Sequence, residues 1–258
     1  MRYRIHISYD GTDYLGWQKQ PEGRTVQGAI ENALKLLLKN DISTQGSGRT
    51  DAGVHALDQV AHFDYDGDLA RFDMVRGLNR FLPSAVVVRE AYRCPDDFHC
   101  LRDAESKTYL YRVLNTPTPN PLKTRYGYWV RSKVDLDYLN QITQPLLGEH
   151  DFKAFQTSGT ELKTTVRHIF EAQWSPSPQD DEEVLFLIRG NGFLKQMVRN
   201  IVGTLLDGHW ERRHSPESIR SILSSKDRQI AGSTAPAQGL TLFKVNYPEN
   251  LDNKCLKL

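Results

Sequence analysis

The stretch of the sequence best suited to chemistry reads QGSGRTDAGVHA, from residue 45 to residue 56. Three of its residues are glycines: Gly46, Gly48 and Gly53. Glycines give the backbone a freedom that neither a helix nor a central strand needs, so a shaped loop is predicted here. The loop holds one carboxylate, Asp51, and Arg49 precedes it by two residues. A nearby opposite charge keeps an acid ionised, which suits a nucleophile or a base.

Two other interpretations of this loop stay open on local grounds. Asp51 can be a turn residue that accepts hydrogen bonds from its own backbone, as Asp before Gly often does. A glycine-rich loop can also expose its amides to a phosphate group. The nucleotide-triphosphate loop ends in Gly-Lys-Ser/Thr, however, and no lysine occurs between Lys39 and Lys107.

The elements around the loop follow from the apolar pattern. Residues 3–9 alternate as a half-buried strand, and Thr25 caps a helix of about fifteen residues with apolar positions at helical spacing. A strand is predicted to enter the Asp51 loop. The first part of the chain then continues with a strand at 59–63, a short helix at 72–82 that stops before Pro83, and a strand at 85–88.

A similar series recurs in the second part of the chain. Strands are predicted at 106–114, 165–174, 184–188 and 240–247. Asp135 caps a helix, Phe193 to Leu206 form another, and Ser215-Pro216 begin a third. The sequence therefore predicts two similar α+β halves, 1–103 and 104–258, each with an antiparallel or mixed sheet backed by helices. The proline-rich run at 116–121 is expected to be a loop excursion and not a linker.

The helix predicted from Phe193 to Leu206 carries a second set of charged groups. Phe193, Met197 and Ile201 stand four residues apart and bury one face, whereas Lys195 and Arg199 share another face. A cation near a helix N-terminus opposes the helix dipole, so Arg199 is expected to have a partner elsewhere. The alternative is a solvated pair of cations.

The composition is that of a globular protein of 258 residues, with 39% hydrophobic and 25% charged residues. No apolar run approaches the roughly 20 residues that span a bilayer, and the N-terminus lacks the apolar centre of a secretion signal, so a cytoplasmic location is expected. Cys94, Cys100 and Cys255 form no CxxC pair, which fits free thiols in a reducing compartment. The eight histidines follow no recognised ligand pattern, and no metal site is expected.

The net charge is only +1, so a polyanionic partner needs a local basic patch. Between residues 102 and 133 there are seven basic and two acidic residues, a balance of 7 − 2 = +5. Tyrosines and a tryptophan are interleaved with them, and aromatic rings beside cations suit stacked bases beside phosphates. Alternating strands with one solvated face explain the spacing equally well.

Separate stretches of the chain resemble one known family. They are YDGTDYLGWQ at 9–18, TVQ at 25–27, GRTDAGVHA at 48–56, FH at 98–99, KTYLY at 107–111, GFL at 192–194, MVR at 197–199 and GL at 239–240. In this order they resemble the bacterial tRNA pseudouridine synthase A family. The match departs after His99, where the family's arginine comes one place late as Arg102, and at Lys195, where an arginine is common.

The resemblance implies an isomerase that converts uridine to pseudouridine at positions 38, 39 or 40 in the anticodon stem-loop of tRNA, without a metal or organic cofactor. It also implies a homodimer whose subunits each have two ferredoxin-like (RRM-like) halves around a basic cleft. Position by position, Asp51 matches the catalytic aspartate and Arg49 the arginine that helps extrude the target base. Tyr109 matches the tyrosine that stacks on the uracil, Arg199 the arginine paired with the aspartate, and Leu240 an apolar residue of the uracil pocket.

The other four residues, Arg49, Tyr109, Arg199 and Leu240, are therefore expected to converge on the carboxylate of Asp51 in one cleft. Two other functions remain alternatives at this point. A non-catalytic RNA-binding module of two ferredoxin-like halves would use only the basic and aromatic interval. A nucleotide-dependent enzyme would use the glycine loop on phosphate, but it lacks the lysine.

Overall fold

The alternation of Ile5 and Ile7 with polar neighbours produces strand β1 (Arg2–Tyr9), in which both isoleucines are fully buried. The computed structural model describes residues 1–69, 73–157, 163–211 and 213–258. It divides into two compact units, one of Met1–Ser106 with Leu242–Leu258 and one of Lys107–Thr241.

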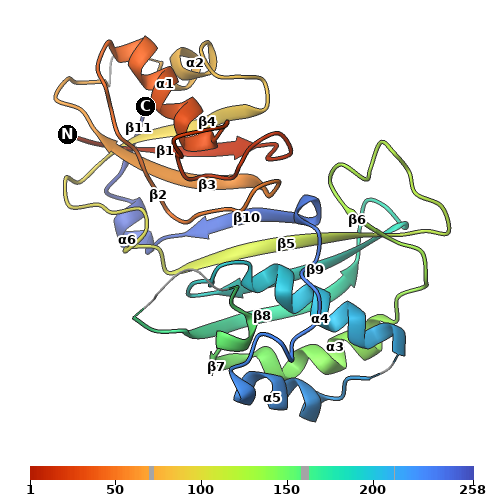
Figure 1. Ribbon diagram of the computed structural model, residues 1–258. Helices are drawn as coiled ribbons and strands as arrows, with labels where there is room; N and C mark the ends of the chain where they lie inside the picture. The colour runs from red at the N-terminus through yellow and green to blue at the C-terminus, as the bar shows by residue number, and fades with distance from the viewer. Residues whose placement is uncertain (70–72, 158–162, 212) are drawn as a thin grey trace. The chain divides into compact units, whose positions relative to one another are not determined.

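The sheet of the first unit has the strand order β11-β4-β1-β3-β10 (Figure 1). Strand β1 runs antiparallel to both of its neighbours, so that Ile5 lies opposite Ala61 on one side and Ala91 on the other. The short strand β2 pairs with β3 beside the Asp51 loop. The other strands are β2 (Gln45–Gly46), β3 (His55–Asp64), β4 (Val86–Cys94), β10 (Leu240–Asn246) and β11 (Leu256–Lys257).

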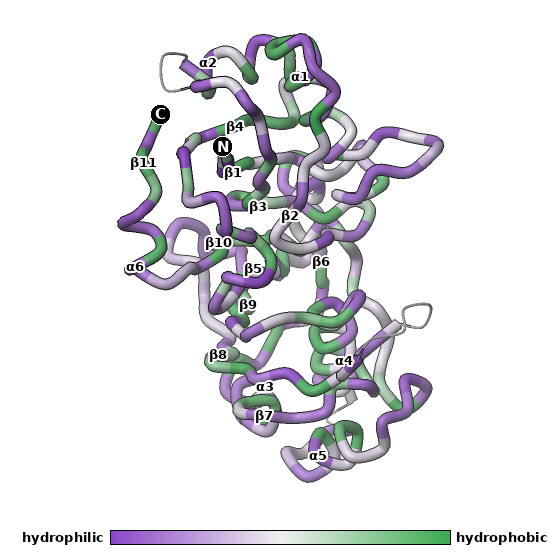
Figure 2. The backbone as a smooth tube through the Cα atoms, turned by 90° about the vertical axis from the view of Figure 1, so that its left-hand side faces the viewer, coloured by the Kyte–Doolittle hydropathy of each residue, from purple (hydrophilic) through white to green (hydrophobic). Residues whose placement is uncertain are grey.

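Helices α1 (Val26–Leu38) and α2 (Met74–Asn79) cover one face of this sheet (Figure 1). Thr25 caps α1 by accepting a hydrogen bond from the backbone N–H of Gly28, as the sequence predicts. The order strand, helix, strand, strand, helix, strand is confirmed. Figure 2 shows hydrophobic segments in β1 and β4, between hydrophilic ones, and the buried isoleucines and valines of these strands contribute to the core of this unit.

The C-terminal segment belongs to the first unit by its contacts. It contains the short helix α6 (Glu249–Asp252), and β11 pairs antiparallel with β4. The side chain of Asp252 forms an ion pair with buried Arg4 on β1 at 2.5 Å. The sequence-based boundary near Asp103 had grouped this segment with the C-terminal half, because pairing between distant strands leaves no local signal.

The sheet of the second unit is built on β5 (Ser106–Asn115), which pairs antiparallel with β9 (Glu183–Gly190). Strand β8 (Val166–Pro176) continues the sheet, followed by β7 (Gly148–Asp151). Strand β6 (Tyr128–Val130) pairs in parallel with β5 after the proline-rich excursion. Trp174 and Phe186 lie at the centre of the core, with ring centroids 4.7 Å apart.

Helices α3 (Leu136–Thr143), α4 (Met197–Glu211) and α5 (Pro216–Ser225) accompany this sheet (Figure 1). Asp135 caps α3, and Ser215 caps α5 together with Ser218, so both predicted caps are confirmed. Single 3₁₀ turns occupy Gln144–Leu146, Lys153–Phe155 and Ala237–Gly239. Among the described residues, no helix is long and apolar enough to cross a membrane.

The predicted start of the second-unit helix at Phe193 is wrong. Gln196 has a φ of 59°, in the left-handed region, so a right-handed helix cannot continue through it. Helix α4 therefore begins at Met197. Lys195 lies before the helix. The prediction that Lys195 and Arg199 share one helical face is therefore wrong.

Two other predicted elements differ in length. The strand expected at 85–88 continues to Cys94, since β4 pairs along all of β1. The helix expected at 72–82 is the shorter α2, capped by Asp73, and Phe72 lies outside the described residues.

Candidate active site

The loop that carries Asp51 connects β2 to β3 and is fixed at its first residues by hydrogen bonds. The backbone N–H of Ser47 donates to the carbonyl oxygen of Val60 at 2.7 Å. The hydroxyl of Ser47 donates to Oε1 of Gln59 at 2.7 Å, and Nε2 of Gln59 donates to the carbonyl of Gly48 at 3.0 Å. Ser47 and Gln59 are fully buried, so these bonds hold the backbone that leads to the carboxylate.

The end of β1 and the segment that follows it hold Thr50, the residue before Asp51. The backbone N–H of Trp17 donates to the carbonyl of Thr50 at 3.1 Å, and the hydroxyls of Tyr9 and Thr50 are 2.7 Å apart. Burial raises the pKa of Tyr9 to about 12. Gly16 has a φ of 94°, and a Cβ at this position would lie 2.4 Å from the carbonyl oxygen of Thr50. Only glycine allows this close approach.

A turn follows the carboxylate. The backbone N–H of Val54 donates to the main-chain oxygen of Asp51 at 3.1 Å, and Gly53 has a φ of 78°. The side chain of Asp51 is half-buried, whereas Arg49 is exposed. The two charged residues thus lie in one shaped loop, as the glycines predict. The anchoring residue Gln59 was missed, because its role depends on its position opposite the loop.

Tyr109 lies on β5 in the second unit, opposite Ile188 on β9. Its ring is 7% exposed and meets the ring of Phe193 edge-on, at 5.0 Å between centroids and 81° between planes. Phe193 lies in the segment before α4, which begins at Met197. A rigid aromatic pair is therefore present at this position of the strand.

Arg199 and Leu240 belong to the surroundings of another tyrosine on β5, Tyr111, which shares a face with Tyr109. The positive charge of Arg199 acts on the Tyr111 hydroxyl, although burial dominates and raises the pKa of that hydroxyl. Nε of Arg199 donates to the carbonyl of Ala235 at 2.8 Å, so Arg199 has a partner outside its helix, as expected. Leu240 is 5% exposed and directly follows the 3₁₀ turn Ala237–Gly239, in which Gly239 packs against the ring of Tyr111.

The structure therefore gathers the site residues as two sets, Arg49 with Asp51 in one unit and Tyr109, Arg199 and Leu240 in the other. The expected convergence of both sets on the Asp51 carboxylate stays a prediction.

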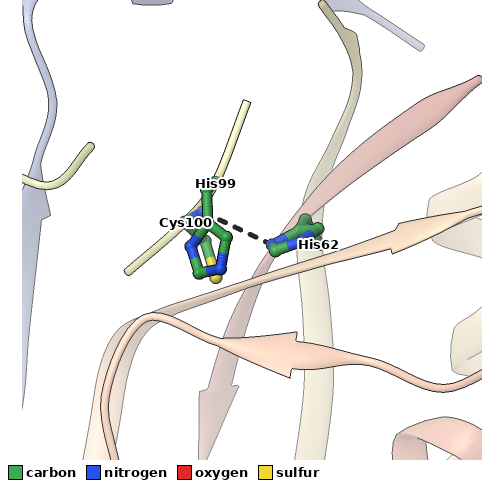
Figure 3. A group of neighbouring side chains, drawn as sticks. All are labelled: His62, His99 and Cys100. Atoms are coloured by element: carbon green, nitrogen blue, oxygen red, sulfur yellow. Dashed lines mark hydrogen bonds between the residues drawn. The ribbon is translucent and has the colours of Figure 1, made fainter. Parts of the chain in front are cut away.

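One group among the described residues has the donor types of a metal site: His62, His99 and Cys100 (Figure 3). Their ligand atoms lie within 4.8 Å of one another, and nitrogen and sulfur donors suit zinc. No sequence pattern indicated this group, since His62 comes from β3 and the other two from the segment after β4. Burial lowers the pKa of His62 to about 4, so the ring is neutral at pH 7.

The hydrogen bonds of this group do not fit a metal. Nδ1 of His62 accepts the backbone N–H of Cys100 at 3.3 Å, and Nδ1 of His99 accepts those of Leu101 and Arg102 at 3.2 and 3.3 Å. A metal-bound histidine instead donates an N–H from its second nitrogen to an acceptor. The ring nitrogens of His62 and His99 therefore hold the backbone of the segment after β4 in place.

A cavity of about 410 Å³ lies on the face of β1 opposite to Ile5 and Ile7. It is lined by Arg4, His6 and Asp58, among others, and not by the Asp51 loop. Nδ1 of His6 lies 2.6 Å from the carboxylate of Asp58. This pair is a separate feature of the first unit.

Comparison with known proteins decides the family. A family model described as tRNA pseudouridine synthase matches residues 5–101 and 142–248. A protein named tRNA pseudouridine synthase A from Bdellovibrio bacteriovorus is 45% identical over 263 residues, which cover 100% of this chain and 99% of that protein. The chain belongs to the tRNA pseudouridine synthase A family.

Two further relatives with the same name support this assignment. The protein from Maridesulfovibrio salexigens is 45% identical over 249 residues, covering 96% of this chain and 91% of its own. The protein from Syntrophotalea carbinolica is 44% identical over 246 residues, covering 95% of each. The chain is thus an isomerase that converts uridine to pseudouridine in tRNA. The matched ranges include Asp51, Arg199 and Leu240, whereas Tyr109 lies between them.

Proposed function

We propose that this enzyme isomerises uridine at position 38, 39 or 40 in the anticodon stem-loop of tRNA, as a cytoplasmic homodimer that needs no cofactor. The observation that carries the proposal is the Asp51 loop. Its GRTDAGVHA sequence resembles the family's catalytic loop, and buried hydrogen bonds from Gln59 and close packing of Gly16 fix its backbone. A catalytic group must be held rigidly to act on one atom of a substrate.

Asp51 is the catalytic residue in this proposal. The reaction breaks the bond between N1 of uracil and C1′ of the ribose, turns the base, and joins C5 to the same C1′, after which C5 loses its proton. An ionised carboxylate serves either of two routes, attack on C1′ or removal of the proton on C2′. Half-burial of Asp51 supports both, since the carboxylate is accessible yet partly shielded.

Arg49 and Tyr109 handle the base. A uridine inside a stem must be flipped out before C1′ can be reached, at a cost of a few kcal/mol. Arg49 is exposed next to Asp51, which supports a role in holding the space that the base vacates. Tyr109 would receive the flipped uracil by stacking. Its edge-on contact with Phe193 supports this role by fixing the ring.

Arg199 and Leu240 complete the proposed pocket. Arg199 would pair with the carboxylate of Asp51, and the bond from its Nε to the carbonyl of Ala235 supports a guanidinium held in a fixed position. Leu240 is an apolar wall that keeps water from the detached uracil. Its burial beside the turn that packs on Tyr111 is consistent with such a wall.

Each unit is proposed to be a ferredoxin-like half, and the basic cleft of the family is proposed to bind the stem-loop. Arg131 and Lys133 are exposed after β6 and support phosphate binding there. Lys123 supports it less, because its ammonium is neutralised by Asp180 at 2.5 Å and Glu182 at 2.6 Å.

Site-resolved mapping of pseudouridine in tRNA from cells with and without this protein tests the proposal. Loss of pseudouridine at 38, 39 or 40 and nowhere else in the tRNA is the expected result. Loss at another position, with these three unchanged, would refute the assignment of the stem-loop. Sedimentation of the purified protein would separately test the dimer, for which a mass of twice 29.5 kDa is expected.

A further inference from the structure

Two of the three cysteines meet where the C-terminal segment joins the sheet of the first unit. Strand β11 is antiparallel to β4, with Leu256 opposite Arg93. Cys255 immediately precedes Leu256 and Cys94 immediately follows Arg93, so the two cysteines adjoin the end of this ladder, where their thiols interact. The thiol of Cys255 also donates to the carbonyl of Leu251, at 3.6 Å. Opposed residues of antiparallel strands have Cα atoms about 4.5–5.5 Å apart, and a disulfide spans about 4.4–6.8 Å, so two cysteines that adjoin the last opposed pair lie near the range of a disulfide. No large backbone movement is needed to join them.

The two thiols differ in access. Cys94 is 6% exposed, whereas Cys255 is half-buried at the edge of the sheet. The hydrogen bond from Cys94 and the nearby charge of Arg4 lower the pKa of the Cys255 thiol. The hydrogen bond to Cys255 and burial raise the pKa of Cys94. A more acidic and more accessible thiol beside a buried one is the arrangement of an attacking and a resolving cysteine.

Arg4 is held in this position from several sides. Its guanidinium forms an ion pair with Asp252, the last residue of helix α6, three residues before Cys255. It also lies over the ring of Tyr92, 4.6 Å from the centroid. A fixed cation beside both sulfur atoms favours whichever of them is a thiolate.

We propose that Cys94 and Cys255 form a reactive thiol pair that is oxidised by low-molecular-weight disulfides, giving a disulfide bond that joins the C-terminal segment to β4. This inference is independent of the proposed tRNA site.

The reaction is an ordinary thiol–disulfide exchange. The thiolate of Cys255 attacks one sulfur of the small disulfide, which breaks its S–S bond, forms a mixed disulfide and releases one small thiol. The thiolate of Cys94 then attacks the Cys255 sulfur and releases the second small thiol. The protein loses two hydrogens and two electrons, and the small disulfide is reduced to two thiols.

The disulfide would attach the C-terminal segment, which few interactions hold, to β4. Beyond residue 252 the segment is held by the short β11 ladder and by an exposed ion pair of Lys257 with Glu90 at 2.5 Å. The bond closes a loop of 255 − 94 = 161 residues. Closing a long loop restricts the unfolded chain, so the oxidised protein is expected to melt at a higher temperature than the reduced protein.

The test treats the folded full-length protein with oxidised glutathione and analyses it by intact mass and non-reduced peptide mapping. The wild type is expected to lose two hydrogens and to yield a linked peptide pair containing Cys94 and Cys255. Cys94→Ser should stop as a glutathione adduct on Cys255, and Cys255→Ser should leave Cys94 unmodified. Cys100→Ser, which changes the remaining thiol, should form the same disulfide as the wild type.

Three free thiols in the treated wild type, or a disulfide that includes Cys100, would overturn the proposal. Adducts formed equally at all three cysteines would also overturn it. If a serine variant at either paired cysteine does not fold, the peptide maps of the wild type and of Cys100→Ser still decide the question. Equal melting temperatures of the oxidised and the reduced wild type would contradict the claim that the disulfide stabilises the protein.

Discussion

Replacement of Gly16 by alanine should slow the isomerisation while leaving the protein folded. The new Cβ would lie 2.4 Å from the carbonyl oxygen of Thr50 and 3.1 Å from the carbonyl carbon of Asp51. Since Cβ contacts under 3.0 Å essentially never occur, the loop must move by at least 3.0 − 2.4 = 0.6 Å. A misplacement of about 1 Å costs on the order of 100-fold in rate, so a 10- to 100-fold fall in kcat is expected, roughly.

Gly23→Ala is the matched control. Gly23 also has a positive φ, 86°, but its Cβ would meet Leu15, a flexible and half-exposed side chain, and not the Asp51 loop. The left-handed backbone costs each alanine variant about 1–2 kcal/mol of unfolding free energy. Only Gly16→Ala should lose kcat, measured by tritium release from tRNA with C5-labelled uridine. Equal kcat values in the two variants would refute the claim that loop placement limits the reaction.

Three further predictions concern base stacking, phosphate contacts and pH. Tyr109→Phe should bind tRNA more tightly than Tyr109→Ala, because a phenyl ring still stacks; equal affinities in filter binding would contradict this. Arg131→Ala and Lys133→Ala should each lower the slope of log affinity against log salt by about 1, whereas Lys226→Ala, which removes a lysine paired with a carboxylate at 2.9 Å, should not; an unchanged slope in all three would exclude a phosphate role. Burial lowers the pKa of His62 from 6.5 to about 4, so the unfolded chain binds more protons in this interval and wild-type stability should fall from pH 6.5 to pH 4 by up to about 3 kcal/mol. Urea denaturation of His62→Gln should lack this part of the loss, and parallel pH curves for the two proteins would show that His62 does not cause it.

Local signals predicted most of the secondary structure. The caps at Thr25, Asp135 and Ser215 are correct because a cap depends on the few residues beside it. The loop around Asp51 is also correct, although only Gly53 of its three glycines has a positive φ and Gly46 lies in strand β2. The family assignment from separated motifs is confirmed by relatives of 44–45% identity over nearly the whole chain.

Features set by tertiary contacts escaped prediction. Gln196 adopts a left-handed conformation that its residue type does not signal, which moved the start of α4 and the place of Lys195. Lys123 looked like part of a basic patch, yet residues nearly 60 positions away neutralise it. The contact of Cys94 with Cys255 needs β11 to pair with β4, and the three cysteines alone suggested only free thiols.

The central claim is that the carboxylate of Asp51 carries the reaction. Asp51→Asn keeps the size of the side chain and removes its charge, and the loop should keep its shape because Gln59 and Ser47 hold its backbone. Tritium release and tRNA affinity measured on the same purified variant test the claim directly. The account predicts no tritium release with tRNA affinity close to that of the wild type. Tritium release at the wild-type rate would contradict it.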